Sequence, residues 1–206
     1  MSKIRQAILE TLSQQGALPV ETIAHATKRT VLSLRYHLTW LEREGLVQQK
    51  DVARCGSVGR PQTLYALADK AHEQFPKQYN ALAAQLLDEI SETLGEKETR
   101  VLLRRAGRRV AASAPALRPT ASTETRLNHT VKFMSERGYM ARWEKSNGDF
   151  LLTVCNCPYR QVAQEHRQVC DLDHAMIATL LDTTPRTLKC IASHDGQCQF
   201  VINKKK

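Results

Sequence analysis

The residues of this chain best suited to chemistry are the cysteines near its carboxyl end. Four of the six cysteines, Cys157, Cys170, Cys190 and Cys198, lie within the last fifty residues, and Cys155 stands two places before the first of them. Twelve, nineteen and seven residues separate the four in turn. Thiolates are soft ligands that bind zinc, copper and iron–sulfur clusters, so this segment is a candidate metal site.

The spacing of these cysteines disfavours some classes of metal and redox site. No C-x-x-C pair is present among them, which argues against an ordinary zinc ribbon or finger and against a thioredoxin-like motif. Iron–sulfur clusters can take thiolates from widely separated segments. Clustered cysteines in a reducing compartment are more often metal ligands or redox switches than structural disulfides. A cluster, a zinc ion and a thiol switch all remain open on spacing alone.

The pattern of residues 121–206 predicts an α+β domain that carries the cysteines at the ends of its elements. Asn147-Gly148 is typical of a hairpin turn, because these two residues tolerate positive dihedral angles. A second hairpin about Asp195-Gly196 places Cys190 and Cys198 on its two arms. The expected helices are Glu124–Arg137, Gln161–Glu165 and Cys170–Leu181, and the expected strands are Tyr139–Glu144, Asp149–Val154, Thr187–Ala192 and Gln199–Ile202.

The other end of the chain predicts a winged helix-turn-helix domain. Helical spacing indicates helices over Ile4–Gln15 and Val20–Ala26, and then a third helix that Gly45 ends. Leu34, Leu38 and Leu41 form the buried stripe of that third helix. Two strands, Leu46–Val52 and Thr63–Leu67, follow and are joined by a polar, glycine-rich and basic tip, which is typical of a wing.

The outer face of the third helix and the wing are the expected DNA contacts. A recognition helix meets base edges and phosphates near its amino-terminal end. The net charge of +9 also favours a polyanionic partner. We expect double-stranded DNA with a palindromic operator as the partner, and the candidate contact residues are Lys28, Arg29, Thr30, Ser33, Arg35, Tyr36 and His37, with Arg54 and Arg60 in the wing.

A long helix, interrupted near Phe75-Pro76, is expected over Asp69–Leu94. Its apolar stripe comprises Tyr79, Leu82, Leu86, Leu87, Ile90 and Leu94. DNA readers of this kind bind palindromic sites as twofold dimers, so the stripe is interpreted as a dimer contact. Packing on the carboxyl-terminal domain of the same chain is the alternative. The basic segment 97–118 is interpreted as a solvated helix face rather than a second phosphate-contacting surface. The expected domains are 1–68, a helical linker and dimerisation region at 69–120, and a sensor at 121–206.

Two stretches resemble known families. RYHLTWLEREGLV, followed by VGRPQTLYAL, resembles the winged-helix repressors of the ArsR and DeoR type over residues 3–68. Residues 155–201, in particular CPYRQVAQEHRQVC and the later C-x7-C-x-F, resemble the sensor region of the SufR iron–sulfur regulators of cluster-assembly operons.

The second resemblance implies a 4Fe-4S cluster bound by Cys157, Cys170 and Cys198. The resemblance is less specific at the position of the fourth cluster ligand. Cys190 is our choice there, because its hairpin places it across from Cys198. Cys155 is the alternative, followed by His166 or an acidic side chain.

These observations together predict a cytoplasmic, dimeric, cluster-dependent repressor of iron–sulfur assembly genes that responds to iron or oxidative status. A thiol-redox or zinc-dependent regulator that uses the same cysteines is the alternative. No apolar run approaches the length of a membrane span and the amino terminus shows no signal-peptide core. No nucleophile and base set, phosphate loop or suggestive carboxylate pair is evident, so no enzymatic activity is expected.

Overall fold

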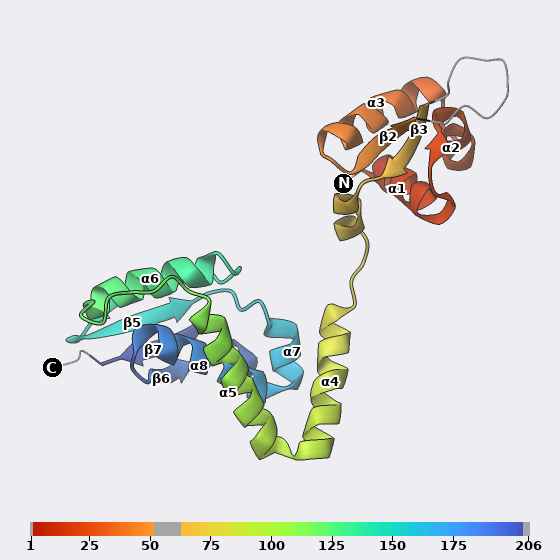
Figure 1. Cartoon of the computed structure of the whole chain (residues 1–206). Helices are drawn as coiled ribbons and strands as arrows, with labels where there is room; N and C mark the ends of the chain where they lie inside the picture. Colours follow the sequence, from red (N-terminus) through yellow and green to blue (C-terminus); the bar gives the residue numbers. More distant parts are fainter. Residues whose placement is uncertain (1, 52–62, 204–206) are drawn as a thin grey trace. The chain divides into compact units, whose positions relative to one another are not determined.

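The chain folds into two compact units, residues 1–77 and 78–206. The structure is a computed structural model that describes residues 2–51 and 63–203 (Figure 1). The observed boundary differs from the expected ones after residues 68 and 120, because residues 69–77 belong to the first unit and the helices of residues 79–112 belong to the second. None of the helices in the described ranges combines the length and apolar character of a membrane span.

The first unit has the element order and sheet of a winged helix-turn-helix. Its strands form an antiparallel sheet in the order β1-β3-β2. The predicted stripe of Leu34, Leu38 and Leu41 is fully buried, as are Ile8 and Leu9 of the first helix. The sequence prediction for these elements is therefore confirmed. The bounds are α1 Lys3–Gln15, β1 Leu18–Pro19, α2 Val20–Thr27, α3 Val31–Arg43, β2 Val47–Asp51, β3 Thr63–Leu67 and the 3-10 helix η1 Asp69–Gln74.

The turn between α2 and α3 is built from polar residues that were predicted as DNA contacts. Lys28 adopts a left-handed conformation with φ of 53°, and its N–H donates to the carboxyl end of α2. Thr30 caps α3, because its hydroxyl accepts a hydrogen bond from the Ser33 N–H at 3.3 Å. These residues therefore set where α3 begins. The wing tip, with Arg54 and Arg60, lies outside the described residues.

The second unit packs helices against a four-stranded antiparallel sheet of order β4-β5-β7-β6. Phe150, Leu152 and Val154 alternate along β5 and are buried against α6 and α8. The register pairs Val154 with Cys198, so Cys198 lies on this same buried face of the sheet. The elements are α4 Tyr79–Leu94, α5 Glu96–Ala112, α6 Thr123–Ser135, β4 Ala141–Ser146, β5 Asp149–Val154, α7 Arg160–Glu165, η2 Arg167–Val169, α8 Cys170–Leu181, β6 Arg186–Lys189, η3 Ile191–Ser193 and β7 Cys198–Ile202.

Both predicted hairpins of the second unit are present. Asn147 and Gly148 both have positive φ, 50° and 87°, as the predicted turn requires. The second hairpin pairs β6 with β7, with an irregularity between Thr187 and Lys189 and a 3-10 turn before Asp195. The expected strand Thr187–Ala192 is wrong beyond Lys189, because residues 191–193 form the 3-10 helix η3. Cys190 therefore lies just after the β6 arm, and Cys198 begins β7 as expected.

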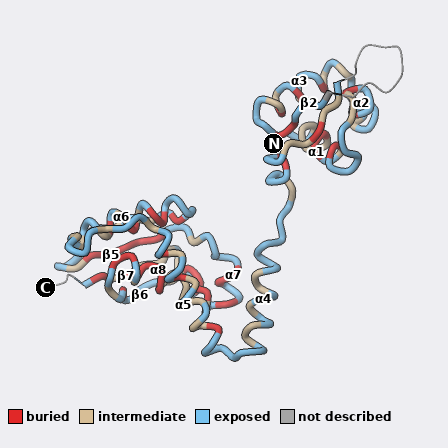
Figure 2. Tube along the Cα trace, viewed as in Figure 1, coloured by how far each residue is buried: buried red, intermediate tan, exposed pale blue. Residues whose placement is uncertain are grey.

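The expected long helix is in fact two elements that belong to different units. η1 ends at Gln74 and α4 begins at Tyr79, because Pro76 cannot continue a helix and disfavours helical geometry at Phe75. No residue of α4 is fully buried (Figure 2). Its stripe is divided, since Leu87 packs within the same unit whereas Tyr79, Leu82, Leu86 and Leu94 are exposed.

The closest helix contact of the second unit joins α5 to α8. A Cβ atom added at Gly107 would lie 2.2 Å from the carbonyl oxygen of Leu172. Backbone atoms cannot give way as a flexible side chain can, so only glycine permits this approach. The sequence gives no sign of this role, because Gly107 stands inside an otherwise strongly helical segment.

We expect Gly107→Ala to destabilise the second unit by about 1–3 kcal/mol, the usual range for overpacking a core. Thermal unfolding followed by circular dichroism measures the change. Gly196→Ala is the matched control, because a Cβ there meets nothing within 4 Å. Equal melting temperatures for the two variants would contradict the close approach.

Candidate metal centre and nucleic-acid interface

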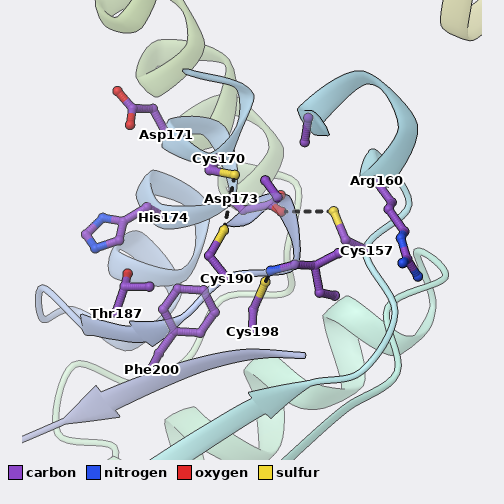
Figure 3. Close-up of a pocket in the computed structure, with 13 residues that line it drawn as sticks. Cys157, Arg160, Cys170, Asp171, Asp173, His174, Thr187, Cys190, Cys198 and Phe200 are labelled. Carbon is purple, nitrogen blue, oxygen red and sulfur yellow. Dashed lines mark hydrogen bonds between the residues drawn. The ribbon is translucent and has the colours of Figure 1, made fainter. Parts of the chain in front are cut away.

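Four cysteines from four separate segments line one cavity of about 140 Å³ in the second unit (Figure 3). Cys157 follows β5, Cys170 begins α8, Cys190 follows β6 and Cys198 begins β7. The structure therefore brings together the four cysteines that the sequence analysis selected, although they are spread over more than forty residues of chain.

The sulfur atoms have different neighbours within the cavity. The Sγ atoms of Cys170 and Cys190 lie 3.7 Å apart. Cys198 Sγ accepts a hydrogen bond from the Ile191 N–H at 3.2 Å. Cys157 Sγ donates to Asp173 Oδ2 at 3.7 Å. Three of the thiols thus lie around the 190–198 loop, while Cys157 is turned toward α8.

The loop between Cys190 and Cys198 is held by its own hydrogen bonds. The Cys190 N–H donates to the Asp195 carboxylate at 2.8 Å. The Cys190 carbonyl accepts from the Ser193 N–H at 2.9 Å. This compact turn explains why two cysteines seven residues apart reach the same cavity.

The amino end of α8 is fixed by ion pairs from α5. Arg104 Nη1 lies 2.9 Å from Asp171 Oδ2, and Arg100 Nη1 lies 3.4 Å from Asp171 Oδ1. These contacts hold the residue that follows Cys170. Part of the basic segment 97–118 therefore pairs inside the unit, whereas the sequence analysis expected only a solvated face.

Burial keeps the thiols of Cys157, Cys170 and Cys198 protonated, because it raises the pKa of each. It raises the pKa of Cys157 to about 12, with a further contribution from the nearby Asp173 carboxylate. It likewise raises the pKa of Cys198 to about 11. The pKa of Cys170 is raised by burial and then by the neighbouring Cys190. Thiolate ligation would therefore release protons from this cavity, and metal binding here is expected to weaken as the pH falls.

Asp173 is a polar residue of this site that the sequence analysis missed. Tyr139 donates its hydroxyl to Asp173 Oδ1, and Cys157 donates to the other oxygen. Burial raises the pKa of Asp173 to about 6, although both hydrogen bonds oppose the shift. The available signal was an acid among the apolar residues of α8. Asp173 orients Cys157 within the cavity.

Of the other proposed fourth ligands, Cys155 and His166 lie outside the cavity, whereas the acidic side chains of Asp171 and Asp173 line it. Cys155 is exposed, and its Sγ accepts from Arg142 Nη1 at 3.0 Å. His166 places Nε2 3.8 Å from Asp88 Oδ1 and does not line the cavity. His174 does line it, with Nε2 2.9 Å from the Pro185 carbonyl oxygen. The geometry thus favours Cys190 over Cys155 and His166 as the fourth thiol of the site.

The cavity is large for a single ion. About 10–15 Å³ is enough for one water molecule, so 140 Å³ has room for a polyatomic group. Within the described residues, no three His, Cys, Asp or Glu side chains gather closely enough to hold one metal ion. Four soft donors around a volume of this size fit an iron–sulfur cluster in donor chemistry.

The predicted DNA face of α3 is mostly open to solvent. Lys28, Arg29, Arg35 and Tyr36 are exposed. His37 differs from the expectation, because it is partly buried beside Tyr36, with ring centroids 5.4 Å apart. Burial, and then the charges of nearby arginines, lower the pKa of His37. The histidine is therefore at the edge of the face.

Leu32 is a second residue that the sequence analysis missed. It lies in the first turn of α3 and is 82% exposed. The spacing of the buried stripe at 34, 38 and 41 leaves position 32 off the stripe, so this exposure was readable from the sequence.

Several solved structures are similar to parts of this chain. No family model and no curated protein matches the chain. A transcriptional regulator homologue from Pyrococcus horikoshii OT3 is 28% identical over 34% of this chain and 67% of its own, with a TM-score of 0.30. PadR of Bacillus subtilis in complex with operator DNA is 13% identical over 85% of this chain and 99% of its own, with a TM-score of 0.31.

Proposed function

We propose that this chain is a dimeric transcriptional repressor whose affinity for operator DNA is set by a 4Fe-4S cluster. The observation that carries the proposal is the convergence of Cys157, Cys170, Cys190 and Cys198 on one cavity, in a chain that also contains a winged helix-turn-helix. The resemblance of residues 155–201 to the SufR sensor region supports a cluster at this place. The same resemblance points to cluster-assembly genes as targets.

A zinc-dependent or thiol-redox regulator is the second candidate. The Cys170 and Cys190 sulfurs, 3.7 Å apart, are close enough to share one zinc ion. Anaerobic purification followed by iron, sulfide and zinc analysis separates the two. A brown preparation with iron and sulfide supports the cluster, and stoichiometric zinc without sulfide contradicts it.

The bound cluster would supply bonds that tie the four cysteine segments together and add to the folding free energy of the unit. The segment between Cys157 and Cys170, which contains α7 and η2, would be held at both ends. This segment also supports α4 through three side-chain contacts: Asn80 Nδ2 to Gln161 Oε1 at 2.6 Å, Gln168 Nε2 to Ser91 Oγ at 3.5 Å, and His166 Nε2 to Asp88 Oδ1 at 3.8 Å.

A small apolar cluster connects the cysteines to α4. Its buried members are Val162, Ala163, Val169 and Ala192. Cys170 and Cys190 pack against it, and so do Ala83 and Leu87 of α4. If the cysteine segments moved, the apolar cluster would move with them, and the packing of α4 on that cluster would therefore change.

The exposed face of α4, Tyr79, Leu82 and Leu86, is our proposed dimer contact. Half-site spacing on a palindrome is fixed by the dimer. Altered support of α4 would therefore change the affinity for operator DNA. Cluster loss under iron scarcity or oxidant exposure would relieve repression.

We expect single changes of Cys157, Cys170 or Cys198 to serine to abolish cluster retention, because each removes a thiolate from the cavity. Cys190→Ser should form a cluster that decays faster in air, since one iron is left without its thiolate. Cys155→Ser is the matched control and should resemble the wild type, because Cys155 is exposed and does not line the cavity. Iron content and visible absorbance during timed air exposure give the comparison. Full iron in Cys157→Ser would overturn the site.

We expect Arg35→Ala to change sequence preference, with a loss of about 1–3 kcal/mol on preferred sites, because a base contact is removed. Arg60→Ala should instead weaken binding to all sequences, as loss of a phosphate contact does. Selection from randomised duplexes, followed by gel shifts, measures both. Arg43→Ala, an exposed arginine in the last turn of α3, is the control. Unchanged binding by Arg35→Ala and Arg60→Ala would exclude this DNA face.

We expect the double variant Leu82→Glu, Leu86→Glu to be monomeric, because burying charges at a twofold contact is costly. Light scattering measures the mass. Met140→Glu is the control, since Met140 is equally apolar, 68% exposed and outside α4. A dimeric double variant would place the dimer contact elsewhere.

A further inference from the structure

We propose that Cys170 and Cys190 form a reversible disulfide when the protein is free of metal, and that this bond locks the cavity against cluster loading. The formation of the bond does not depend on the proposed function, whereas its effect on loading rests on that function.

The distances within the cavity select this pair. The Cys170 and Cys190 sulfurs are 3.7 Å apart, and each is the other's hydrogen-bond partner. Cys157 is turned to the Asp173 carboxylate, and Cys198 accepts from a backbone N–H. Cys155 lies outside the cavity beside Arg142. The geometry therefore favours one pair among the thiols of the described residues.

The backbones of both cysteines are anchored, so the sulfurs stay close. Cys170 begins α8, where Arg100 and Arg104 hold the adjacent Asp171. The Cys190 N–H is held by Asp195 at 2.8 Å. A disulfide has a sulfur separation of about 2.05 Å, so the remaining closure is small. Anchored partners raise the effective concentration of one thiol at the other.

The reaction needs a two-electron oxidant, for which hydrogen peroxide is the simplest. The sulfur that attacks must first lose its proton to solvent, and burial slows this step at Cys170 because it raises the pKa of that thiol. The resulting thiolate attacks a peroxide oxygen, and the O–O bond breaks to give a sulfenic acid and water once protons are transferred. The second sulfur attacks the sulfenic sulfur, the S–S bond forms and a second water leaves. Two thiols and one peroxide give one disulfide and two waters, so the sulfur pair loses the two electrons that the peroxide gains.

The disulfide would make the protein respond differently to iron scarcity and to oxidant. A protein emptied by iron scarcity keeps four thiols and can reload at once. A protein emptied by oxidant loses two of the four proposed ligands to the disulfide, and it reloads only after a thiol reductant cleaves that bond. The pair would thus prolong derepression after oxidant exposure.

The test treats metal-free full-length protein with hydrogen peroxide, alkylates the remaining thiols and maps peptides without reduction. Trypsin with Asp-N separates Cys190 from Cys198, because Asp195 lies between them. We expect a Cys170–Cys190 linked peptide and alkylated Cys155, Cys157 and Cys198. A different linkage, or oxidised thiols without linkage, overturns the proposed pair.

Two variants test the disulfide pair independently of the proposed cluster ligands. Cys190→Ser should lose the linked peptide, while Cys157→Ser should keep it, although we expect the latter to lose the cluster. If Cys157→Ser retains both full iron and the linkage, the cluster site fails and the disulfide stands. Loss of the linkage in Cys157→Ser counts against the disulfide pair.

Reconstitution with iron and sulfide tests the lock itself. We expect the linked protein to take up no cluster and dithiothreitol to restore uptake, as visible absorbance and iron analysis report. Full uptake by protein that is still linked overturns the lock.

Discussion

The packing of α5 against α8 is the constraint on which the second unit depends. Gly107 admits the Leu172 carbonyl oxygen to a distance that no other residue allows. Arg104 holds Asp171 one residue earlier. Both contacts fall directly after Cys170, and the opposite side of α8 belongs to the core beneath the sheet. The helix that presents Cys170 and Asp173 to the cavity is therefore fixed from two sides.

The cavity surrounds four thiols with buried surroundings. Burial favours the protonated thiol, whereas metal coordination would favour the thiolate. Burial holds Cys157, Cys170 and Cys198 in their protonated form at neutral pH, and it raises the pKa of the Asp173 carboxyl to about 6. A bound metal group would reverse this preference, because coordination removes thiol protons outright. Occupancy by such a group would therefore change the charge inside the unit as well as its cross-links. This is a physical basis for a structural difference between the loaded and empty states.

α4 faces two environments, and the sequence shows only that its stripe is apolar. Ala83 and Leu87 turn to the cysteine segments, while Leu82 and Leu86 remain exposed. A helix without a fully buried residue is held mainly by its neighbours. Its packing therefore depends directly on the segments that carry Cys170 and Cys190.

The sequence by itself determined the local elements and the ligand chemistry. Helical periodicity set the buried stripe of α3, and Asn147-Gly148 set its hairpin, because both depend on neighbouring residues alone. The choice of soft ligands followed from residue type.

Only the tertiary structure decided which groups meet. It placed Cys190 beside Cys170, left Cys155 outside the cavity and brought Asp173 to Cys157. It also assigned residues 69–77 and α4 to different units. Such facts depend on strand register and helix contacts between residues far apart in the chain, and one-dimensional periodicity does not carry that information.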